Sequence, residues 1–531
     1  MRVPWRLAQI VLIVVLLAAG QPARAEQQAA QGNVDWPHIG NTTDQHHYSA
    51  LHQITAATVG RLRLTWSLSE GSNLTLFEDT PVVVAGIIYL TTNTDQVIAA
   101  RADTGRRLWT FTPTVDFLHQ MMSGDMVQPV NRGVEVANGH VYLATYDDQL
   151  LSLDAATGKR EWRVVVANPD QYYEQSPPTY WHDLLFLGEA GIGPGVRGFV
   201  AAFDARTGRL RWRFSTVPAF GHGWMAGNGQ TGGGDVWMPV TVDATTGIVY
   251  AGTGNPTPAL VNRARPGCDQ WTDATLAIDG RTGRLLWGRT QVCSDVWDYD
   301  SAQSPMLLSV YQRGKSVSAV GEGSKAGRYW IFNARTGATL AVSPLLGTQT
   351  VPRPIPSPRG VLVCPGIYGS LEYSPPAYSP RTGLIYLPGL DLCTIDRSLS
   401  ASSRGQSPSV VAFGGKAAVA SGRPSGFLAA LDPSTGHIRW QVKVSRPMIG
   451  GALATAGNLV FSGADDGHFY AFDARSGAIL WHPAIGLGVG GAPITYMVNG
   501  VQYVAIAAGG SAVAPETGAR IGGRLLVFRL G

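Results

Sequence analysis

A short pattern of apolar and polar residues recurs along most of the chain. Each copy has an apolar or alternating strand that ends in Asp, a turn of the form x-x-[Thr/Ser]-Gly, and a second strand that carries a tryptophan. The copies run Asp103–Trp109, Asp154–Trp162, Asp204–Trp212, Asp279–Trp287, Asp432–Trp440 and Asp473–Trp481. The glycine supplies the positive φ that such a turn requires, so each copy predicts a β-hairpin.

Two further segments keep part of this pattern. Residues 333–337 have the turn but no tryptophan, and residues 62–66 have the strand and tryptophan but no turn. Together the eight units recur at spacings of about 40 to 75 residues, the period of propeller blades. One blade cannot bury both of its faces, whereas a closed ring of blades can. We therefore predict an all-β fold, an eight-bladed β-propeller of four-stranded antiparallel blades, in which the strand Leu525–Phe528 completes the first blade and the tryptophans pack between blades.

Composition and charge agree with a large globular protein. The 531 residues include 65 glycines and 33 prolines, and 45% of the side chains are apolar, far too many for a disordered chain. The formal net charge is only +4, and no Lys/Arg block runs through the sequence. Nucleic acid is therefore excluded as the expected partner.

The first 25 residues have the pattern of a secretory signal peptide. Arg2 and Arg6 precede an apolar run over residues 10–19, which is followed by Ala23-Arg24-Ala25. We expect cleavage there, export to the periplasm, and one propeller domain over residues 26–531. An uncleaved membrane anchor is the alternative, although the apolar run is short for a span, and no later segment is long and apolar enough to cross a bilayer.

The four cysteines are consistent with export. Cys268, Cys293, Cys364 and Cys393 allow three disulfide connectivities, of which the sequential pairs Cys268–Cys293 and Cys364–Cys393 are the simplest. None lies in a CxxC or CxxCH motif, so the sequence offers neither a thiolate zinc site nor a covalent haem. Electrons from any redox reaction would have to leave to a separate carrier.

Two long gaps separate the hairpin signals, at residues 212–279 and 333–432. Insertions in a propeller gather on one face of the ring, so we expect the functional site there, over the central axis.

Motifs in these gaps and elsewhere resemble those of a known family. They are Asp35-Trp-Pro37, His47-Tyr-Ser49, Val59-Gly-Arg-Leu62, Val130-Asn-Arg-Gly-Val134, Gly195-Val-Arg-Gly198, Gly232-Gly-Gly234 with Trp237, Gly252-Thr-Gly-Asn255, Asp295-Val-Trp-Asp-Tyr299, Ala492-Pro-Ile-Thr-Tyr496 and Gly500-Val-Gln-Tyr503. Because these motifs occur in the family's order, the chain resembles the quinoprotein alcohol dehydrogenases. These are eight-bladed propellers that use pyrroloquinoline quinone (PQQ), and they include the methanol dehydrogenases. The resemblance covers nearly all of residues 26–531.

The chemistry of such a site can be stated independently of the family. A quinone that accepts hydride benefits from a hard cation on its oxygens, a carboxylate that takes the alcohol proton, and donors for developing negative charge. A flat aromatic side chain should stack on the quinone ring.

The resemblance assigns these roles to particular residues. Asp298 matches the catalytic base, Lys325 the cation beside the reactive carbonyl, and Trp237 the tryptophan that stacks on the quinone. Glu78 and Arg132 match cofactor contacts. On the residues alone, Asp298 also fits a turn cap, Trp237 fits blade packing, and Arg132 and Lys325 fit solvated loops.

The resemblance also implies a metal ion, either Ca²⁺ or a lanthanide. Asn255 matches its amide ligand, Asp298 matches a carboxylate ligand, and Asp300 resembles the additional ligand of the lanthanide-dependent methanol dehydrogenases. An ordinary exposed aspartate is the other interpretation of Asp300. The glutamate ligand of the family falls at Gly193, so we expect Glu189 to reach the ion from a rearranged loop.

Other departures surround the expected cofactor. The vicinal cysteine pair of the family falls at Met126-Val127, and Met126 would cover the quinone instead. The two Asn-Trp pairs of the family fall at Glu372-Tyr373 and Met448-Ile449. These changes remove amide or indole donors from the rim of the pocket.

From these observations we predict a periplasmic PQQ-dependent dehydrogenase. It would oxidise a primary alcohol or a related small hydroxyl compound to the aldehyde and pass electrons to a separate c-type cytochrome. A rival hypothesis is a propeller that keeps the fold but acts as a binding or assembly module without quinone turnover. A third is an enzyme whose altered pocket takes a polyol or a sugar.

Overall fold

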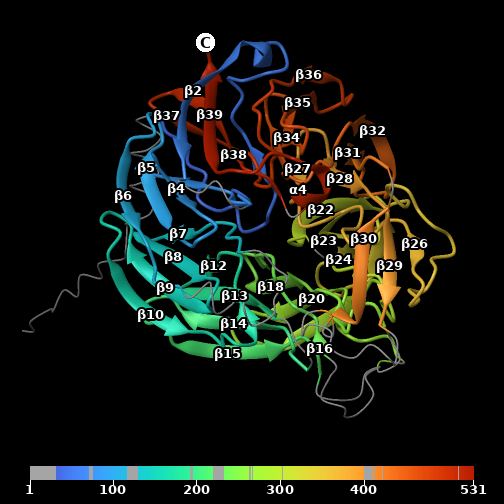
Figure 1. Cartoon of the computed structure of the whole chain (residues 1–531). Helices are drawn as coiled ribbons and strands as arrows, with labels where there is room; N and C mark the ends of the chain where they lie inside the picture. Colours follow the sequence, from blue (N-terminus) through green and yellow to red (C-terminus); the bar gives the residue numbers. More distant parts are fainter. Residues whose placement is uncertain are drawn as a thin grey trace, which may run out of the picture.

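In the computed structural model, the strands are arranged around a central axis (Figure 1). The structure describes residues 32–70, 76–115, 129–191, 195–218, 232–261, 265, 267–301, 303–399, 410, 413–420, 422–511 and 513–531. The expected signal peptide lies outside these residues. Within them, no helix has the length and apolar character needed to cross a membrane.

Four-stranded antiparallel sheets repeat around the axis, as the hairpin pattern predicts. In chain order the first four are β3 (Val82–Val84), β4 (Ile87–Thr91), β5 (Val97–Arg101), β6 (Arg107–Phe111); β7 (Glu135–Ala137), β8 (His140–Thr145), β9 (Gln149–Asp154), β10 (Arg160–Val165); β12 (Thr179–Trp181), β13 (Leu184–Gly191), β14 (Phe199–Asp204), β15 (Leu210–Ser215); and β17 (Thr241–Val242), β18 (Ile248–Gly252), β20 (Ala274–Asp279), β21 (Leu285–Thr290). The fold is all-β, and each predicted turn joins the third and fourth strands of a sheet.

The same arrangement continues through the second half of the chain. The sheets are β22 (Met306–Gln312), β23 (Lys315–Ser324), β24 (Arg328–Asn333), β25 (Thr339–Val342); β27 (Ala377–Ser379), β28 (Leu384–Asp391), β31 (Ser425–Leu431), β32 (Ile438–Val444); β33 (Ala452–Thr455), β34 (Leu459–Gly463), β35 (Phe469–Asp473), β36 (Ile479–Trp481); and β37 (Ile494–Val498), β38 (Val501–Ala508), β39 (Arg524–Leu530), β2 (Leu62–Ser69). In the last sheet β2 pairs with β39 from the other end of the chain, which confirms that a carboxy-terminal strand closes the ring with the strand that carries Trp66.

Smaller elements lie outside this repeat. They are β1 (Tyr48–Ser49), β11 (Tyr172–Tyr173), β16 (Gly232–Gly233), β19 (Pro256–Thr257), β26 (Val361–Val363), β29 (Thr394–Ser398), β30 (Gly415–Val419), the 3-10 turn η1 (Val59–Arg61) and the short helix α4 (Ala514–Thr517). β16 pairs with β19, and β26, β29 and β30 form a separate three-stranded sheet. Both arise from the long gaps between hairpin signals.

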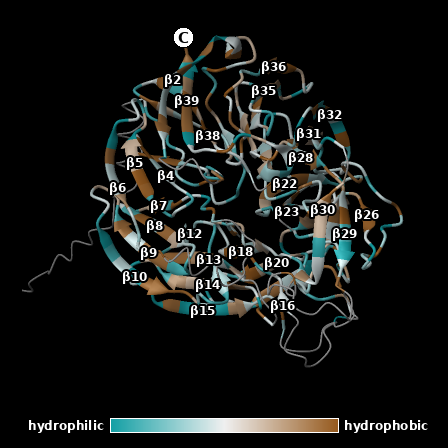
Figure 2. Ribbon diagram, viewed as in Figure 1, coloured by the Kyte–Doolittle hydropathy of each residue, from teal (hydrophilic) through white to brown (hydrophobic). Residues whose placement is uncertain are grey.

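Burial changes from the first strand of each sheet to the last. β4, β8 and β13 are almost entirely buried, whereas β6, β10 and β15 alternate between exposed and half-buried side chains. Hydrophilic residues accordingly mark β10 and β15 at the outside of the ring (Figure 2). The fourth strand therefore lies at the outside of each sheet, and the first strand faces the axis.

An amino-terminal segment, residues 34–49, covers the free edges of the first strands. We call it the axial strap. Backbone N–H groups of Val83, Val242, Leu307, Tyr378, Ala454 and Met497 donate in turn to its carbonyls. These donors belong to or border the first strands of six different sheets, so the strap ties the sheets together and leaves these edges no open partner sites.

The repeated tryptophans pack between neighbouring sheets, as predicted. Trp287 donates from Nε1 to the Ala334 carbonyl of the next sheet (2.9 Å), and a Cβ on Gly337 of that turn would lie 2.7 Å from the Trp287 ring. Trp109 and Trp212 make the same contact with the next turns. We call the hairpin turns together with these tryptophans the hairpin rim. The turn glycines are needed both for positive φ and for this close approach.

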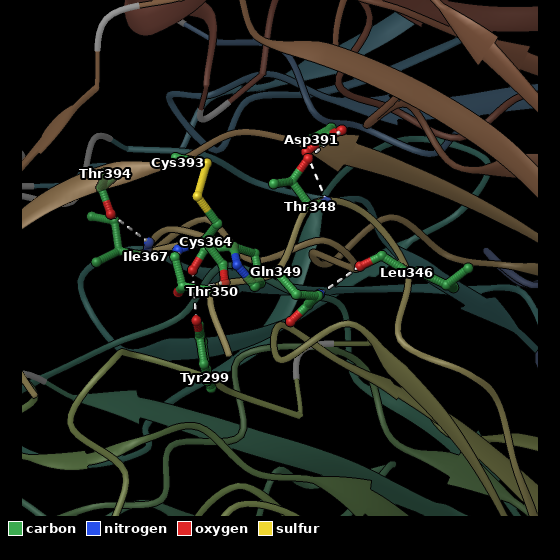
Figure 3. The surroundings of a disulfide bond; sticks show 11 residues. Tyr299, Leu346, Thr348, Gln349, Thr350, Cys364, Ile367, Asp391, Cys393 and Thr394 are labelled. Carbon is green, nitrogen blue, oxygen red and sulfur yellow. Dashed lines mark hydrogen bonds between the residues drawn. A yellow bond between two sulfur atoms is a disulfide. The ribbon is translucent and has the colours of Figure 1, made fainter. Parts of the chain in front are cut away.

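Both simplest disulfide pairs form, Cys268–Cys293 and Cys364–Cys393. The second joins the end of β26 to the start of β29, with Thr350 and Tyr299 beside it (Figure 3). The hydroxyl of Tyr299 donates to the carbonyl of Pro365 (2.5 Å). The disulfide therefore holds the loop that contacts the segment carrying Asp298.

Candidate functional site

Most of the predicted site residues come from two equivalent places in successive sheets. Glu78, Arg132, Trp237, Asp298 and Asp300 lie shortly before a first strand, whereas Asn255 and Lys325 lie just after a second strand. First and second strands are antiparallel, so the start of one and the end of the other lie at the same end of the ring. This topology brings residues that are far apart in sequence to one axial end.

Lys325 is the centre of a buried group of charges. Its Nζ lies 3.1 Å from Asp298 Oδ2, 2.9 Å from Asp300 Oδ2 and 3.4 Å from Glu372 Oε1. The side chain of Lys325 is only 8% exposed. We call these four residues the Lys325 cluster. A solvated loop lysine, the other interpretation of the sequence, is excluded by this burial.

The cluster shifts the pKa values of its members. Burial alone would lower the pKa of Lys325, but the carboxylates of Asp298, Asp300 and Glu372 outweigh it and raise the pKa well above its ordinary value. Burial raises the pKa of Asp298 to about 7, with Lys325 opposing the shift and Asp300 adding to it. Lys325 therefore stays charged, while Asp298 can take up and release a proton near neutral pH.

Backbone contacts fix the positions of the cluster. The amide of Lys325 donates to the Asp300 carbonyl (2.9 Å), and the amide of Ser370 donates to the Lys325 carbonyl (2.9 Å). The turn before Asp298 is capped by Asp295, whose carboxyl accepts from the amides of Trp297 and Tyr299. Asp298 itself has a φ of +66°, a conformation that few non-glycine residues adopt. Because Asp295 caps this turn, the carboxyl of Asp298 does not cap it and pairs with Lys325 instead.

A second cation also lies beside Trp237. The guanidinium of Arg132 is 5.3 Å from the centroid of the Trp237 ring and 4.7 Å from that of Tyr373. Lys325 Nζ is 5.8 Å from the same Trp237 ring. Arg132 also pairs with buried Glu78 (Nη2 to Oε2, 2.8 Å). The indole thus has two buried cations beside it, an arrangement suited to a flat anionic aromatic group.

Asn255 joins this group through its backbone. Its amide N–H donates to Asp300 Oδ1 (2.7 Å). Asp300 is 4% exposed, so it is not the ordinary surface aspartate that the sequence alone allowed. The structure thus brings together Asn255, Asp298, Asp300, Lys325, Trp237, Arg132 and Glu78 at one end of the ring.

Glu189 does not join the same group. Its buried carboxyl faces those of Glu174 and Asp148, which together with burial raise its pKa well above the ordinary value. Met126 and Gly193, the other two positions in the expected pocket, lie outside the described residues. Among the predicted site residues that are described, Glu189 is the one placed apart.

Two members of the site were missed or misjudged from sequence. From the sequence, Glu372 was noted only because it replaces the asparagine of an Asn-Trp pair of the family. In the structure it is an ionic partner of Lys325. Asp235 was not singled out, although it directly follows Gly232-Gly-Gly234 and lies two residues before Trp237. Burial, Asp300 and Asp298 raise the pKa of Asp235 well above the ordinary value. Its place between two recognised motifs was the available signal.

The residues fit both groups that the resemblance implies. Arg132 and Lys325 beside an indole suit a flat, polyanionic quinone, and carboxylate and amide oxygens suit a hard cation. Within the described ranges, no three His, Cys, Asp or Glu side chains are arranged to hold a metal by themselves. The Asn255 amide and oxygens of a cofactor would have to complete the set. Oδ1 of Asp235 could contribute, because it is buried and finds no hydrogen-bond partner among the described residues.

Comparisons with known proteins agree with this geometry. The family model "PQQ: Glucose/ethanol/alcohol dehydrogenase, beta-propeller domain" matches residues 36–344 and 416–504. The quinohemoprotein alcohol dehydrogenase of Comamonas testosteroni is 32% identical, over 90% of this chain and 72% of the relative. The crystal structure of the protein with that name has a TM-score of 0.86 at 30% identity, covering 97% of this chain and 83% of the other. A europium-containing methanol dehydrogenase has a TM-score of 0.85 at 27% identity, covering 94% and 98%.

Proposed function

Since the chain belongs to the PQQ-dependent alcohol dehydrogenase family, we propose that it oxidises a primary alcohol or a related small hydroxyl compound to the aldehyde. The observation that carries the proposal is the Lys325 cluster beside Trp237. It unites a carboxyl that titrates near neutral pH, a permanent buried cation and a stacking ring. The oxidoreductase class follows from the family, whereas the substrate and the roles below are the proposal.

Asp298 accepts the hydroxyl proton of the substrate. Its pKa of about 7 leaves a large fraction of the carboxyl ionised at neutral pH and still basic enough to take a proton. Lys325, held 3.1 Å from Asp298 Oδ2, keeps that carboxylate in place. Its ammonium also donates to oxygens on which negative charge develops, without any rearrangement.

Trp237, Arg132 and Glu78 bind and orient the cofactor. The Trp237 indole supplies the stacking surface, and Arg132 supplies a buried cation for its carboxylates. PQQ, when bound, supplies the carbonyl carbon that accepts the hydride of the substrate. Tyr373, Ile449 and Val513 pack in one apolar cluster with Trp237 and exclude water from this side. Tyr373 and Ile449 stand at two of the positions where the sequence departs from the family's Asn-Trp pairs.

A hard cation, Ca²⁺ or a lanthanide, would be held by Asn255, Asp298 and Asp300. Such an ion supplies Lewis acidity. Asp300 favours a lanthanide because it adds a buried negative charge next to two others, Asp298 and Asp235. The europium-containing relative supports this choice.

The remaining predictions complete the proposal. The predicted count of eight blades is supported by the recurrence of four-stranded sheets and by the pairing of β2 with β39. Cleavage after residue 25 would deliver residues 26–531 to the periplasm. A separate c-type cytochrome would take the electrons.

The test is a titration of the purified mature protein with PQQ in the presence of Ca²⁺, La³⁺ or a chelator, followed by quinone absorbance. Dye reduction with a panel of primary alcohols, polyols and sugars is measured in the same samples. Metal-dependent binding with alcohol turnover is expected, and a preference for polyols or sugars would redirect the substrate. Absence of PQQ binding with every ion would overturn the proposal in favour of a non-catalytic binding module.

A further inference from the structure

The site as derived lacks an anionic metal ligand. The resemblance puts the glutamate ligand of the family at Gly193, and Glu189, the expected substitute, faces Glu174 and Asp148 instead. Of the remaining ligands Asn255, Asp298 and Asp300, Asp298 is also needed as the proton acceptor. The inference rests on the proposed function: another residue of this chain has to supply the missing carboxylate.

A run of glycines brings Asp235 against the segment of Asn255. β16 and β19 pair antiparallel, with Gly233 opposite Pro256. The amide of Gly234 donates to the Asn255 carbonyl (3.0 Å), and the amide of Gly254 donates to the Asp235 carbonyl (2.7 Å). A Cβ at Gly233 would lie 2.2 Å from the Asn255 carbonyl oxygen, so only glycine permits this approach. Asp235 therefore lies across from the Gly254–Asn255 pair.

Asp300 contacts the same pair through Asn255. Its Oδ1 accepts the Asn255 amide at 2.7 Å. Asp300 is also the strongest charged neighbour of the Asp235 carboxyl, ahead of Asp298. Asp235 and Asp300 thus flank Asn255 with two carboxylates and one side-chain amide, all of them oxygen donors that suit a hard cation.

The Asp235 carboxyl is also available for a ligand. Oδ1 is buried and has no hydrogen-bond partner in the described part of the chain. A buried carboxylate oxygen without a donor is costly unless a proton or a cation satisfies it. The backbone amide of Gly191, two residues before Gly193, also hydrogen-bonds to the carboxyl. The Asp235 carboxyl therefore lies beside Gly191, which is two residues before position 193 in the sequence.

We propose that Asp235 supplies the carboxylate ligand that Gly193 cannot, and that it binds the metal ion together with Asn255 and Asp300. Asp298 then remains paired with Lys325 as the proton acceptor and does not have to bind the ion. The assignment exchanges a ligand on one loop for a ligand on the adjacent glycine-rich strand. It gives Asp235 the role that we expected of Glu189.

The test compares Asp235→Asn with the matched control Glu189→Gln. Both replace a buried carboxyl group by an amide of the same shape. Tb³⁺ is titrated into each purified protein, with and without PQQ, and its luminescence is excited through tryptophan; the Trp237 indole lies close to Gly254 and is a nearby donor. We expect Asp235→Asn to weaken Tb³⁺ binding by about 10- to 100-fold, and Glu189→Gln to stay within about twofold of wild type.

Three outcomes would overturn the assignment. They are wild-type affinity in Asp235→Asn, a larger loss in Glu189→Gln than in Asp235→Asn, and no Tb³⁺ binding by the wild type with or without PQQ. Failure of the proposed function has a different signature. A wild type that binds Tb³⁺ but reduces no dye with PQQ and any alcohol would refute the dehydrogenase and leave the two variants to decide the ligand. Thermal unfolding of both variants, expected within about 3 °C of wild type, excludes misfolding.

Discussion

The hairpin rim and the Lys325 cluster handle charge in opposite ways. At the rim, ion pairs such as Arg439 with Asp432 are exposed, and the buried contacts are tryptophan rings on glycine turns. In the cluster, one lysine and three carboxyl groups are buried together. The rim repeats one contact from sheet to sheet, whereas each residue of the cluster occurs once. On the proposed function, the repeated contacts stabilise the ring, and we propose that the unrepeated charges perform the chemistry.

The largest expected effect comes from removing the cation of the cluster. Lys325→Met keeps the length of the side chain but leaves Asp298, Asp300 and Glu372 without their partner. We expect turnover, measured as dye reduction with PQQ and alcohol, to fall by about 100- to 1,000-fold. Lys315→Met, at an exposed position on β23, is the control and should leave turnover unchanged. Turnover within tenfold of wild type in Lys325→Met would place the chemistry elsewhere.

Breaking one contact of the hairpin rim should lower stability and leave turnover nearly unchanged. Trp287→Ala removes a buried ring, its bond to the Ala334 carbonyl and its packing on Gly337. We expect the free energy of unfolding in urea to fall by about 3 to 5 kcal/mol. Turnover per folded molecule should stay within about twofold of wild type, because no cluster residue is touched. A folded but inactive Trp287→Ala would refute the division between rim and cluster.

The pH dependence of kcat/KM tests the role of Asp298 in the Lys325 cluster. Burial raises the pKa of its carboxyl to about 7, against the opposing effect of Lys325. Below that pH the carboxyl is protonated and cannot accept the substrate proton. We expect kcat/KM to rise about tenfold per pH unit up to pH 7 and then to level off. A flat profile between pH 5 and 8 would mean that Asp298 is not the titrating base.

The smallest effect separates the two roles of Gly337, with Gly383, in the β27–β28 turn outside the hairpin rim, as the comparison. Gly337 and Gly383 have nearly the same φ, +66° and +68°, but a Cβ meets the Trp287 ring only at Gly337 and meets nothing within 4 Å at Gly383. We expect Gly383→Ala to cost about 1 kcal/mol for its backbone alone. Gly337→Ala should cost about 1 to 3 kcal/mol more in urea unfolding. Equal costs would show that the tryptophan contact contributes nothing.

The rim was predictable from sequence, and the cluster only in part. Strand alternation and turn glycines are local signals, so the hairpins and the closing strand are found as predicted. The resemblance supplied Asp298, Lys325, Trp237 and Arg132, which the structure brings together. The role of Glu372 at Lys325 depends on how separate sheets meet at the axis. No local pattern records that geometry.

The same reason explains the positions that were misplaced or missed. Spacing along the chain suggested Glu189 as a metal ligand, but the strand direction turns its carboxyl to Glu174 and Asp148. The axial strap, residues 34–49, has no repeat pattern, and its partners are distributed over six sheets. Contacts between sheets, rather than within one, limit what the sequence alone can predict.

The most direct test of the account is turnover by Asp298→Asn, measured with bound PQQ, metal and alcohol. The substitution preserves the shape of the side chain and removes its ability to accept the proton. We predict a loss of about 100- to 10,000-fold in kcat, with wild-type PQQ binding and a melting temperature within about 3 °C of wild type. Wild-type turnover by a correctly loaded Asp298→Asn would contradict the assignment of the chemistry to the Lys325 cluster.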